Sequence, residues 1–261
     1  EDDEAEPYLL LTITDAEGKV VDRIKQPAKK GMHRVTWNLR YPPTSPVQLP
    51  RSEPELPWEL EDEGPLVLPG TYYVSLGSVV DGEYNDLVSK VPFVVRTLDN
   101  TTLPAEDREA LVSFLNDVEE LGRSVYGAAR VQRELLNHIE YIEAAILETS
   151  EAPAGMMQQV REAEKKLLKI GLELNGDQSL ARRQFETMPS IADRVGSITY
   201  GMWYSTSEPT QTARQNYAIA AETFTPVYAE LKSVYNEIGE MEKTLESYGA
   251  PYTPGRMPLW E

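Results

Sequence analysis

The chain has 261 residues, which is enough for two domains of ordinary size. Its formal net charge of −18 disfavours nucleic acid as a partner, because an acidic surface repels phosphate backbones. The absence of cysteine excludes disulfides, thiol nucleophiles and cysteine-based metal sites, and only two histidines, His33 and His138, are present. No apolar run approaches the ~20 residues that a membrane-spanning helix needs.

The first part of the chain has the period-two pattern of β-strands. Residues 8–14 and 19–24 predict two strands, and the turn Asp15–Gly18 between them makes a hairpin. Residues 32–39 predict a further strand. The alternation along it places four side chains on the buried face: His33, Val35, Trp37 and Leu39.

Residues 41–69 are rich in proline and acidic residues, a composition that predicts a long loop. Trp58 lies within it and is interpreted either as an anchor that pins the loop or as an exposed binding aromatic. An acidic run in the same loop offers oxygen ligands for Ca²⁺, but it lacks regular ligand spacing, so we predict no metal site there. Its members are Glu59, Glu61, Asp62 and Glu63.

After the loop, residues 71–76 predict a strand, Asp81-Gly82 a tight turn, and residues 87–97 the last strand or strands. Together these signals amount to roughly six or seven short strands. Residues 1–99 are therefore predicted to form an immunoglobulin-like or fibronectin type III-like β-sandwich that carries the loop at 41–69.

Beyond Asp99 the apolar residues follow alternating spacings of three and four, which indicates helices. A long helix is predicted from about 104 to about 149, with Gln132 as the one polar member of its apolar seam. Gln132 is interpreted as a register-setting or half-buried polar residue. Ser190 and Asp193 resemble a capping box at the start of a short helix, and Pro226 predicts a kink in the last one. The remaining helices are predicted near 156–174, 191–202 and 213–248.

Residues 100–261 are thus predicted to form an up-down helical bundle of two long and two short helices with a C-terminal tail. A three-helix arrangement with a broken middle helix is the alternative. The fold class is all-β plus all-α in two domains. A strict apolar seam in such a bundle also leaves homo-oligomerisation through the helices open.

No sequence motif for catalysis, phosphate binding or metal binding is found, so we predict no catalytic, cofactor-binding or metal residue. The densest aromatic run is residues 200–204. Within it, Trp203 and Tyr204 either pack between helices or form an exposed platform for a sugar or a protein. The candidate contact residues are therefore Trp58, Trp203 and Tyr204.

Three runs carry a resemblance to a known family: DAEGKVV, KKGMHRVTWNLRYP and VLPGTYYVSLG. They resemble the region that follows the β-propeller in large bacterial sortilin-like proteins, often labelled BNR-repeat or glycosyl-hydrolase-like. The pattern is also similar to the flagellar hook-cap type of sandwich at the C-termini of exported proteins. The sortilin-like family has a helical segment after the sandwich, which residues 99–248 match, and one departure is VRTL at 95–98 in place of a DPR-like turn. The matching residues serve turns and core: Gly31, Trp37, Pro69, Gly70 and Tyr72.

The resemblance implies a non-catalytic accessory or interaction region of an exported multidomain bacterial protein, which supports or presents an upstream β-propeller. It implies a secreted, periplasmic or cell-surface location. Separately, the sequence starts without an initiator Met or a signal peptide, so Glu1 is expected to be either the start of a processed chain or an arbitrary boundary. Two alternatives remain: an accessory module of a sialidase-like glycoside hydrolase, and a carbohydrate-binding module. The expected partners are the propeller, another protein, a glycan or a second copy of the chain.

Overall fold

A computed structural model describes the chain except for residues 1–4, 48, 50–62, 99–102, 259 and 261. Within this described part, no helix combines the length and the apolar character that a bilayer crossing requires. Trp58 and three members of the acidic run, Glu59, Glu61 and Asp62, lie outside the described residues.

The chain forms two compact units. The first, which we name the sheet unit, comprises residues 1–44, 50–116 and 200–209. The second, the helical unit, comprises residues 45–49, 117–199 and 210–261.

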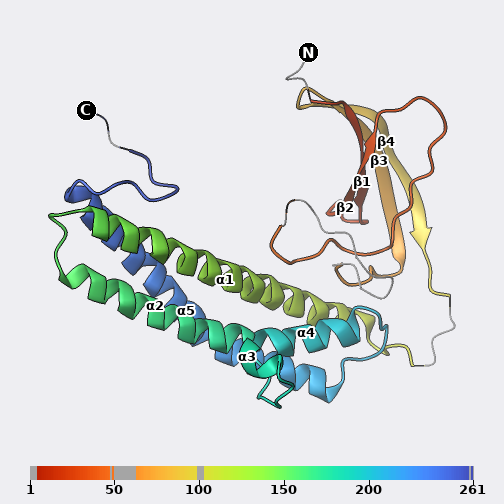
Figure 1. Ribbon diagram of the computed structural model, residues 1–261. Coiled ribbons are helices and arrows are strands. Elements are labelled where there is room, and N and C mark those ends of the chain that lie inside the picture. Colours follow the sequence, from red (N-terminus) through yellow and green to blue (C-terminus); the bar gives the residue numbers. More distant parts are fainter. Residues whose placement is uncertain (1–4, 48, 50–62, 99–102, 259, 261) are drawn as a thin grey trace. The chain divides into compact units, whose positions relative to one another are not determined.

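Within its described residues, the sheet unit has one antiparallel sheet of four strands as its framework (Figure 1). The strands are β1 (Tyr8–Thr14), β2 (Val20–Pro27), β3 (Gly70–Val80) and β4 (Glu83–Val95). Their order across the sheet is β2-β1-β3-β4, so β2 and β4 are the two edges.

Both predicted hairpin turns are confirmed. In the first, the Gly18 amide donates to the Asp15 carbonyl at 3.2 Å, and Gly18 adopts a φ of 85° that favours glycine. In the second, Asp81 and Gly82 both have positive φ, 49° and 81°, as a type I′ turn requires. This turn matches the right-handed twist of the strands that it joins, which explains why Asp-Gly is found there.

The predicted strand at 32–39 is wrong, because residues 32–38 form no ladder. His33 is exposed rather than buried, and its Nε2 lies 2.7 Å from the Lys29 carbonyl oxygen. Leu39 has a φ of 62°, a left-handed conformation that interrupts an extended strand, and is 39% exposed. The β-sandwich is therefore not confirmed, since the described residues form one sheet of four strands instead of two packed sheets.

The period-two pattern of 32–39 nevertheless has a physical basis. Trp37 is half-buried and packs edge-on against Tyr72 and Phe93, with ring centroids 5.7 and 5.9 Å apart. The segment therefore covers the sheet through side chains and adds no strand to it. The apolar cluster on the sheet consists of Ile13, Val21, Val67 and Tyr72, with Trp37 and five other partly buried residues around it.

In the described residues after the sheet there are five helices (Figure 1). They are α1 (Arg108–Glu148), α2 (Gly155–Asn175), α3 (Gln178–Ala181), α4 (Ile191–Met202) and α5 (Gln211–Ser247). α1 begins four residues later than predicted, because the Asp107 carboxylate caps it by accepting from the Ala110 amide at 2.9 Å. The predicted capping box of α4 is confirmed: the Ser190 hydroxyl accepts from the Asp193 amide, and the Asp193 carboxylate accepts from the Ser190 amide.

The core of the helical unit draws apolar residues from α1, α2, α4 and α5. Six regularly spaced positions of α2 are buried: Met156, Val160, Ala163, Leu167, Ile170 and Leu174. These are the positions that the alternating three-four spacing selects, so that pattern predicted the buried side of α2.

Gln132 fixes the contact between α1 and α2. It is 3% exposed, and its Nε2 donates to the Leu167 carbonyl oxygen at 2.9 Å. One turn further along α2, a Cβ at Gly171 would lie 2.7 Å from the same nitrogen, so only glycine leaves room for the amide. The register-setting interpretation of Gln132 agrees with this geometry.

Candidate functional site

The register of the sheet assigns its side chains to two faces. Residues directly opposite each other in an antiparallel pair point to the same side. Ile13 lies opposite Val74, which lies opposite Val91, and Leu11 lies opposite Leu76, which lies opposite Val88. All of these positions therefore share the face that carries the core, which we name the core face.

The core face is only partly covered. Tyr72, Val74 and Phe93 lie beneath Trp37 and Val67 within the apolar cluster. The other part of the face lies outside that cluster, and in it Val88 is 44% exposed and Val91 is 48% exposed. Leu11 and Leu76 beside them are intermediate in burial. We name these four residues the open patch: Leu11, Leu76, Val88 and Val91.

Neither edge of the sheet suits the addition of another strand. β4 carries two register shifts opposite β3, between Val74 and Leu76 and between Leu76 and Gly77, and it contains Pro92. β2 carries Arg23 and Lys25. Bulges, proline and edge cations are the features by which natural sheets resist edge-to-edge pairing. Contacts of this sheet are thus expected on its faces.

The opposite face is aromatic and basic. Lys25 Nζ lies 4.1 Å above the Tyr8 ring centroid, and Lys90 Nζ lies 6.0 Å from that of Tyr73. The ring of Tyr84 occupies the space that a Cβ at Gly77 would fill. This face therefore presents aromatic rings and cations, together with Val94, which is 57% exposed.

Arg40 is the centre of the most buried polar cluster in the sheet unit. The residue is 8% exposed, and its guanidinium donates to the carbonyl oxygens of Gly64 at 3.0 Å and Trp203 at 2.8 Å. Arg40 Nε lies 2.9 Å from Glu63, and the guanidinium carbon lies 4.4 Å from the Tyr204 ring centroid. A buried arginine in this setting satisfies several backbone carbonyls at once, so the cluster holds separate segments together.

Two of the three predicted contact residues, Trp203 and Tyr204, contact Arg40 in this cluster. Trp203 is 7% exposed, so its ring is not part of an exposed platform. Tyr204 is 48% exposed and one side of its ring is beside Arg40. Sequence reasoning missed Arg40, since nothing in the local pattern distinguishes it from the exposed cations before it.

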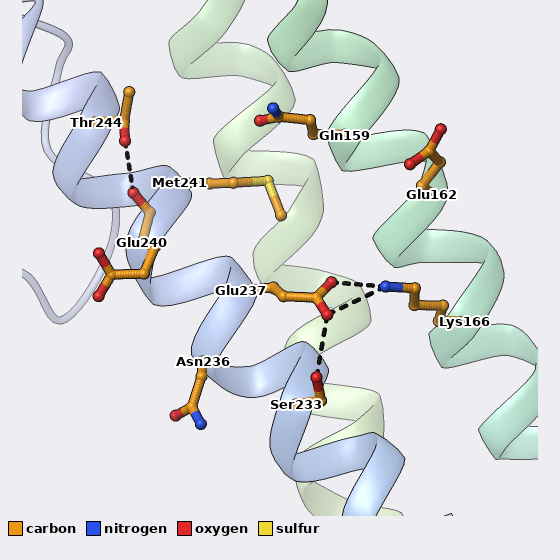
Figure 2. Close-up of a pocket in the computed structure, with 9 residues that line it drawn as sticks. All are labelled: Gln159, Glu162, Lys166, Ser233, Asn236, Glu237, Glu240, Met241 and Thr244. Carbon is orange, nitrogen blue, oxygen red and sulfur yellow. Dashed lines mark hydrogen bonds and ion pairs between the residues drawn. The ribbon is translucent and has the colours of Figure 1, made fainter.

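The helical unit holds a groove between α2 and α5 (Figure 2). Lys166 reaches across it to both oxygens of Glu237, at 2.8 and 3.1 Å, and the Ser233 hydroxyl donates to the same carboxylate. The hydrogen bond with Glu237 raises the pKa of Lys166. The two charged groups at the centre of the groove, Lys166 and Glu237, are thus paired with each other.

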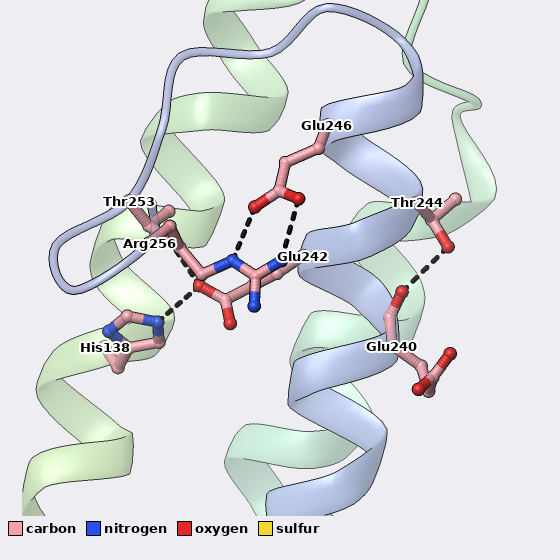
Figure 3. Close-up of polar contacts among 7 residues, drawn as sticks. All are labelled: His138, Glu240, Glu242, Thr244, Glu246, Thr253 and Arg256. Atoms are coloured by element: carbon pink, nitrogen blue, oxygen red, sulfur yellow. Dashed lines mark hydrogen bonds and ion pairs between the residues drawn. The ribbon is translucent and has the colours of Figure 1, made fainter. Parts of the chain in front are cut away.

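A second polar cluster connects α1, α5 and the segment after α5 (Figure 3). Glu242 is 7% exposed, and one of its oxygens contacts both His138 Nε2, at 2.6 Å, and the Thr253 hydroxyl. Beside it, Arg256 makes a bidentate pair with Glu246 at 2.5 and 2.7 Å, which lowers the pKa of Glu246. The cluster fastens residues 253–256 to α5 and to α1.

These arrangements position and fasten segments of the chain. In the described ranges, no three His, Asp or Glu side chains come together as a potential metal site. Glu63, the one described member of the acidic run, is paired with Arg40. The open patch is an apolar part of an exposed sheet face, and apolar side chains in such a place favour burial.

Comparison with known proteins adds no assignment to this geometry. No protein-family model, no curated protein and no solved structure was found to match the chain.

Proposed function

We propose that this chain is a non-catalytic interaction region of a larger exported bacterial protein, and that the open patch packs against a neighbouring domain of the same polypeptide. The observation that carries the proposal is the half-exposed pair Val88 and Val91 on the core face. The resemblance in sequence points to a β-propeller as the neighbour, with this region supporting or presenting it.

The chemistry of the patch favours a lasting contact over a transient one. All four of its residues are aliphatic, and interfaces formed within one polypeptide or one stable assembly are rich in such residues. The bulged, proline-containing edge at β4 favours a contact through the face of the sheet. A face-to-face contact of this kind would supply the second layer that a single sheet lacks.

The test uses the absence of cysteine from the chain, which makes any introduced thiol a unique probe within it. We compare Val91→Cys in the open patch with Val94→Cys, which lies on the opposite face of the same strand and is 57% exposed. Thiol labelling rates are measured for each variant in this chain alone and in the longer polypeptide, with the labelled peptide identified by mass.

We expect the thiol at position 91 to be protected in the longer polypeptide by at least about tenfold, and the thiol at position 94 to react equally in both. Equal labelling of position 91 in the two contexts would refute the proposed contact. Protection of position 94 alone would place the contact on the aromatic and basic face.

A further inference from the structure

A run of basic residues stands apart from the rest of this acidic protein. Residues 23–34, RIKQPAKKGMHR, contain five Lys or Arg and no Asp or Glu, in a chain whose formal net charge is −18. We name the five cations the basic run: Arg23, Lys25, Lys29, Lys30 and Arg34. All five side chains are exposed.

The basic run differs in its pairing from several cations of the helical unit. Arg130, Arg161 and Lys166, among others there, form ion pairs with carboxylates. None of the five cations of the basic run forms an ion pair with another described residue. Their charges are therefore available to an external anion, since distant acidic residues are screened beyond about 8 Å at physiological salt.

Local contacts give the segment a defined form. Lys25 is held over the Tyr8 ring at 4.1 Å. After β2, the Lys29 amide donates to the Pro27 carbonyl at 2.9 Å, and His33 Nε2 contacts the Lys29 carbonyl oxygen. Gly31 has a φ of 127°, which turns the chain where a side chain would be strained. The turn carries Met32, which is 101% exposed.

A fully exposed apolar side chain among cations distinguishes between classes of anionic partner. A soluble polyanion would engage Lys29, Lys30 and Arg34 and leave Met32 in water. A bilayer offers anionic headgroups for the cations and an apolar layer beneath them for the methionine. The geometry points to the basic run and Met32 as a peripheral docking surface for an anionic lipid bilayer.

Vesicle co-sedimentation of the 261-residue chain tests this proposal. We expect binding to vesicles of phosphatidylglycerol and phosphatidylcholine at low salt, weaker binding at physiological salt, and no binding to phosphatidylcholine alone. Lys29→Gln with Lys30→Gln should weaken binding by about 25-fold, because each cation near such a surface contributes about fivefold. Met32→Ser should weaken it by a further few-fold at unchanged salt dependence.

The matched control is Lys165→Gln with Lys232→Gln, which removes the same charge from two exposed positions of the helical unit. This control should change binding by less than about twofold. Absence of binding to the anionic vesicles at low salt would overturn the proposal, as would an equal loss in the control. Binding of dextran sulfate that competes with the vesicles, together with no effect of Met32→Ser, would assign the surface to a soluble polyanion instead.

Discussion

The core of the helical unit and the apolar cluster on the sheet differ greatly in size. Among the described residues, the helical core contains 24 buried members, 23 from four helices and Ala250 after α5, whereas the cluster on the sheet contains four. The difference follows from how helices and sheets bury their apolar side chains. Helices with apolar stripes bury those stripes against one another, while a sheet has two faces and needs a separate layer for each apolar one. The apolar stripes of the helices thus cover one another, whereas part of the core face of the sheet is left half-exposed.

The sharpest test of this contrast is a cavity in the helical core. Leu167 is fully buried, so Leu167→Ala should lower the free energy of unfolding of the helical unit by about 3 kcal/mol, through lost burial and the cavity left behind. The adjacent Leu168 is 52% exposed, and Leu168→Ala should cost less than about 0.5 kcal/mol. Urea unfolding followed by circular dichroism measures both. If the two variants lost similar amounts of unfolding free energy, α2 would not bury the helix face that carries Leu167.

In the sheet unit, the largest single effect is expected from a polar residue. Arg40→Ala removes the donor to two carbonyl oxygens and leaves Glu63 without its ion pair, at a cost of about 2 to 3 kcal/mol. Arg34→Ala, at an exposed and unpaired position, is the control and should be neutral within about 0.5 kcal/mol. Limited proteolysis of residues 38–66 reports on this unit directly. An unchanged cleavage rate in the Arg40 variant would show that the small apolar core suffices alone.

The sequence predicted the helices better than the sheet, and the reason lies in the range of the interactions. Positions such as Val160 and Leu167 are selected by neighbours three and four residues away, so a short window of sequence identifies them. The placement of Trp37 depends on Tyr72 and Phe93, which are far along the chain, and its alternating pattern was indistinguishable from that of a strand. Arg40 was missed for the same reason.

Gly171, which lies where α1 and α2 meet, tests the register of these two helices. Helix propensity alone predicts that alanine at this position raises stability, whereas the contact with Gln132 predicts that it lowers stability. Gly171→Ala should lower stability by about 1 to 2 kcal/mol, because the new Cβ displaces the Gln132 amide from the Leu167 carbonyl. Gly127 and Gly239 have open space around the corresponding position, so alanine there should raise stability by about 0.5 to 1 kcal/mol. Thermal unfolding of the three variants measures the difference. Stabilisation by all three would contradict the close approach of Gln132.

The smallest expected effect, and the one specific to the sheet core, comes from Tyr72. Its hydroxyl donates to the Leu68 carbonyl at 2.7 Å, and burial raises the pKa of Tyr72 from 10.0 to about 12. The folded state therefore retains this proton where the unfolded state has lost it, so the contribution to stability is complete below pH 10 and declines as pH rises from 10 to about 12. Tyr72→Phe should cost about 1 kcal/mol at neutral pH and remove the part of the alkaline decline that this hydroxyl causes.

Phenolate absorbance and unfolding curves, measured together between pH 10 and about 12, decide the outcome. An alkaline decline in stability that persists unchanged in Tyr72→Phe would assign the decline to other groups. A normal titration of Tyr72 would further indicate that water reaches the sheet core, and that the layer over it at Trp37 is looser than its packing implies.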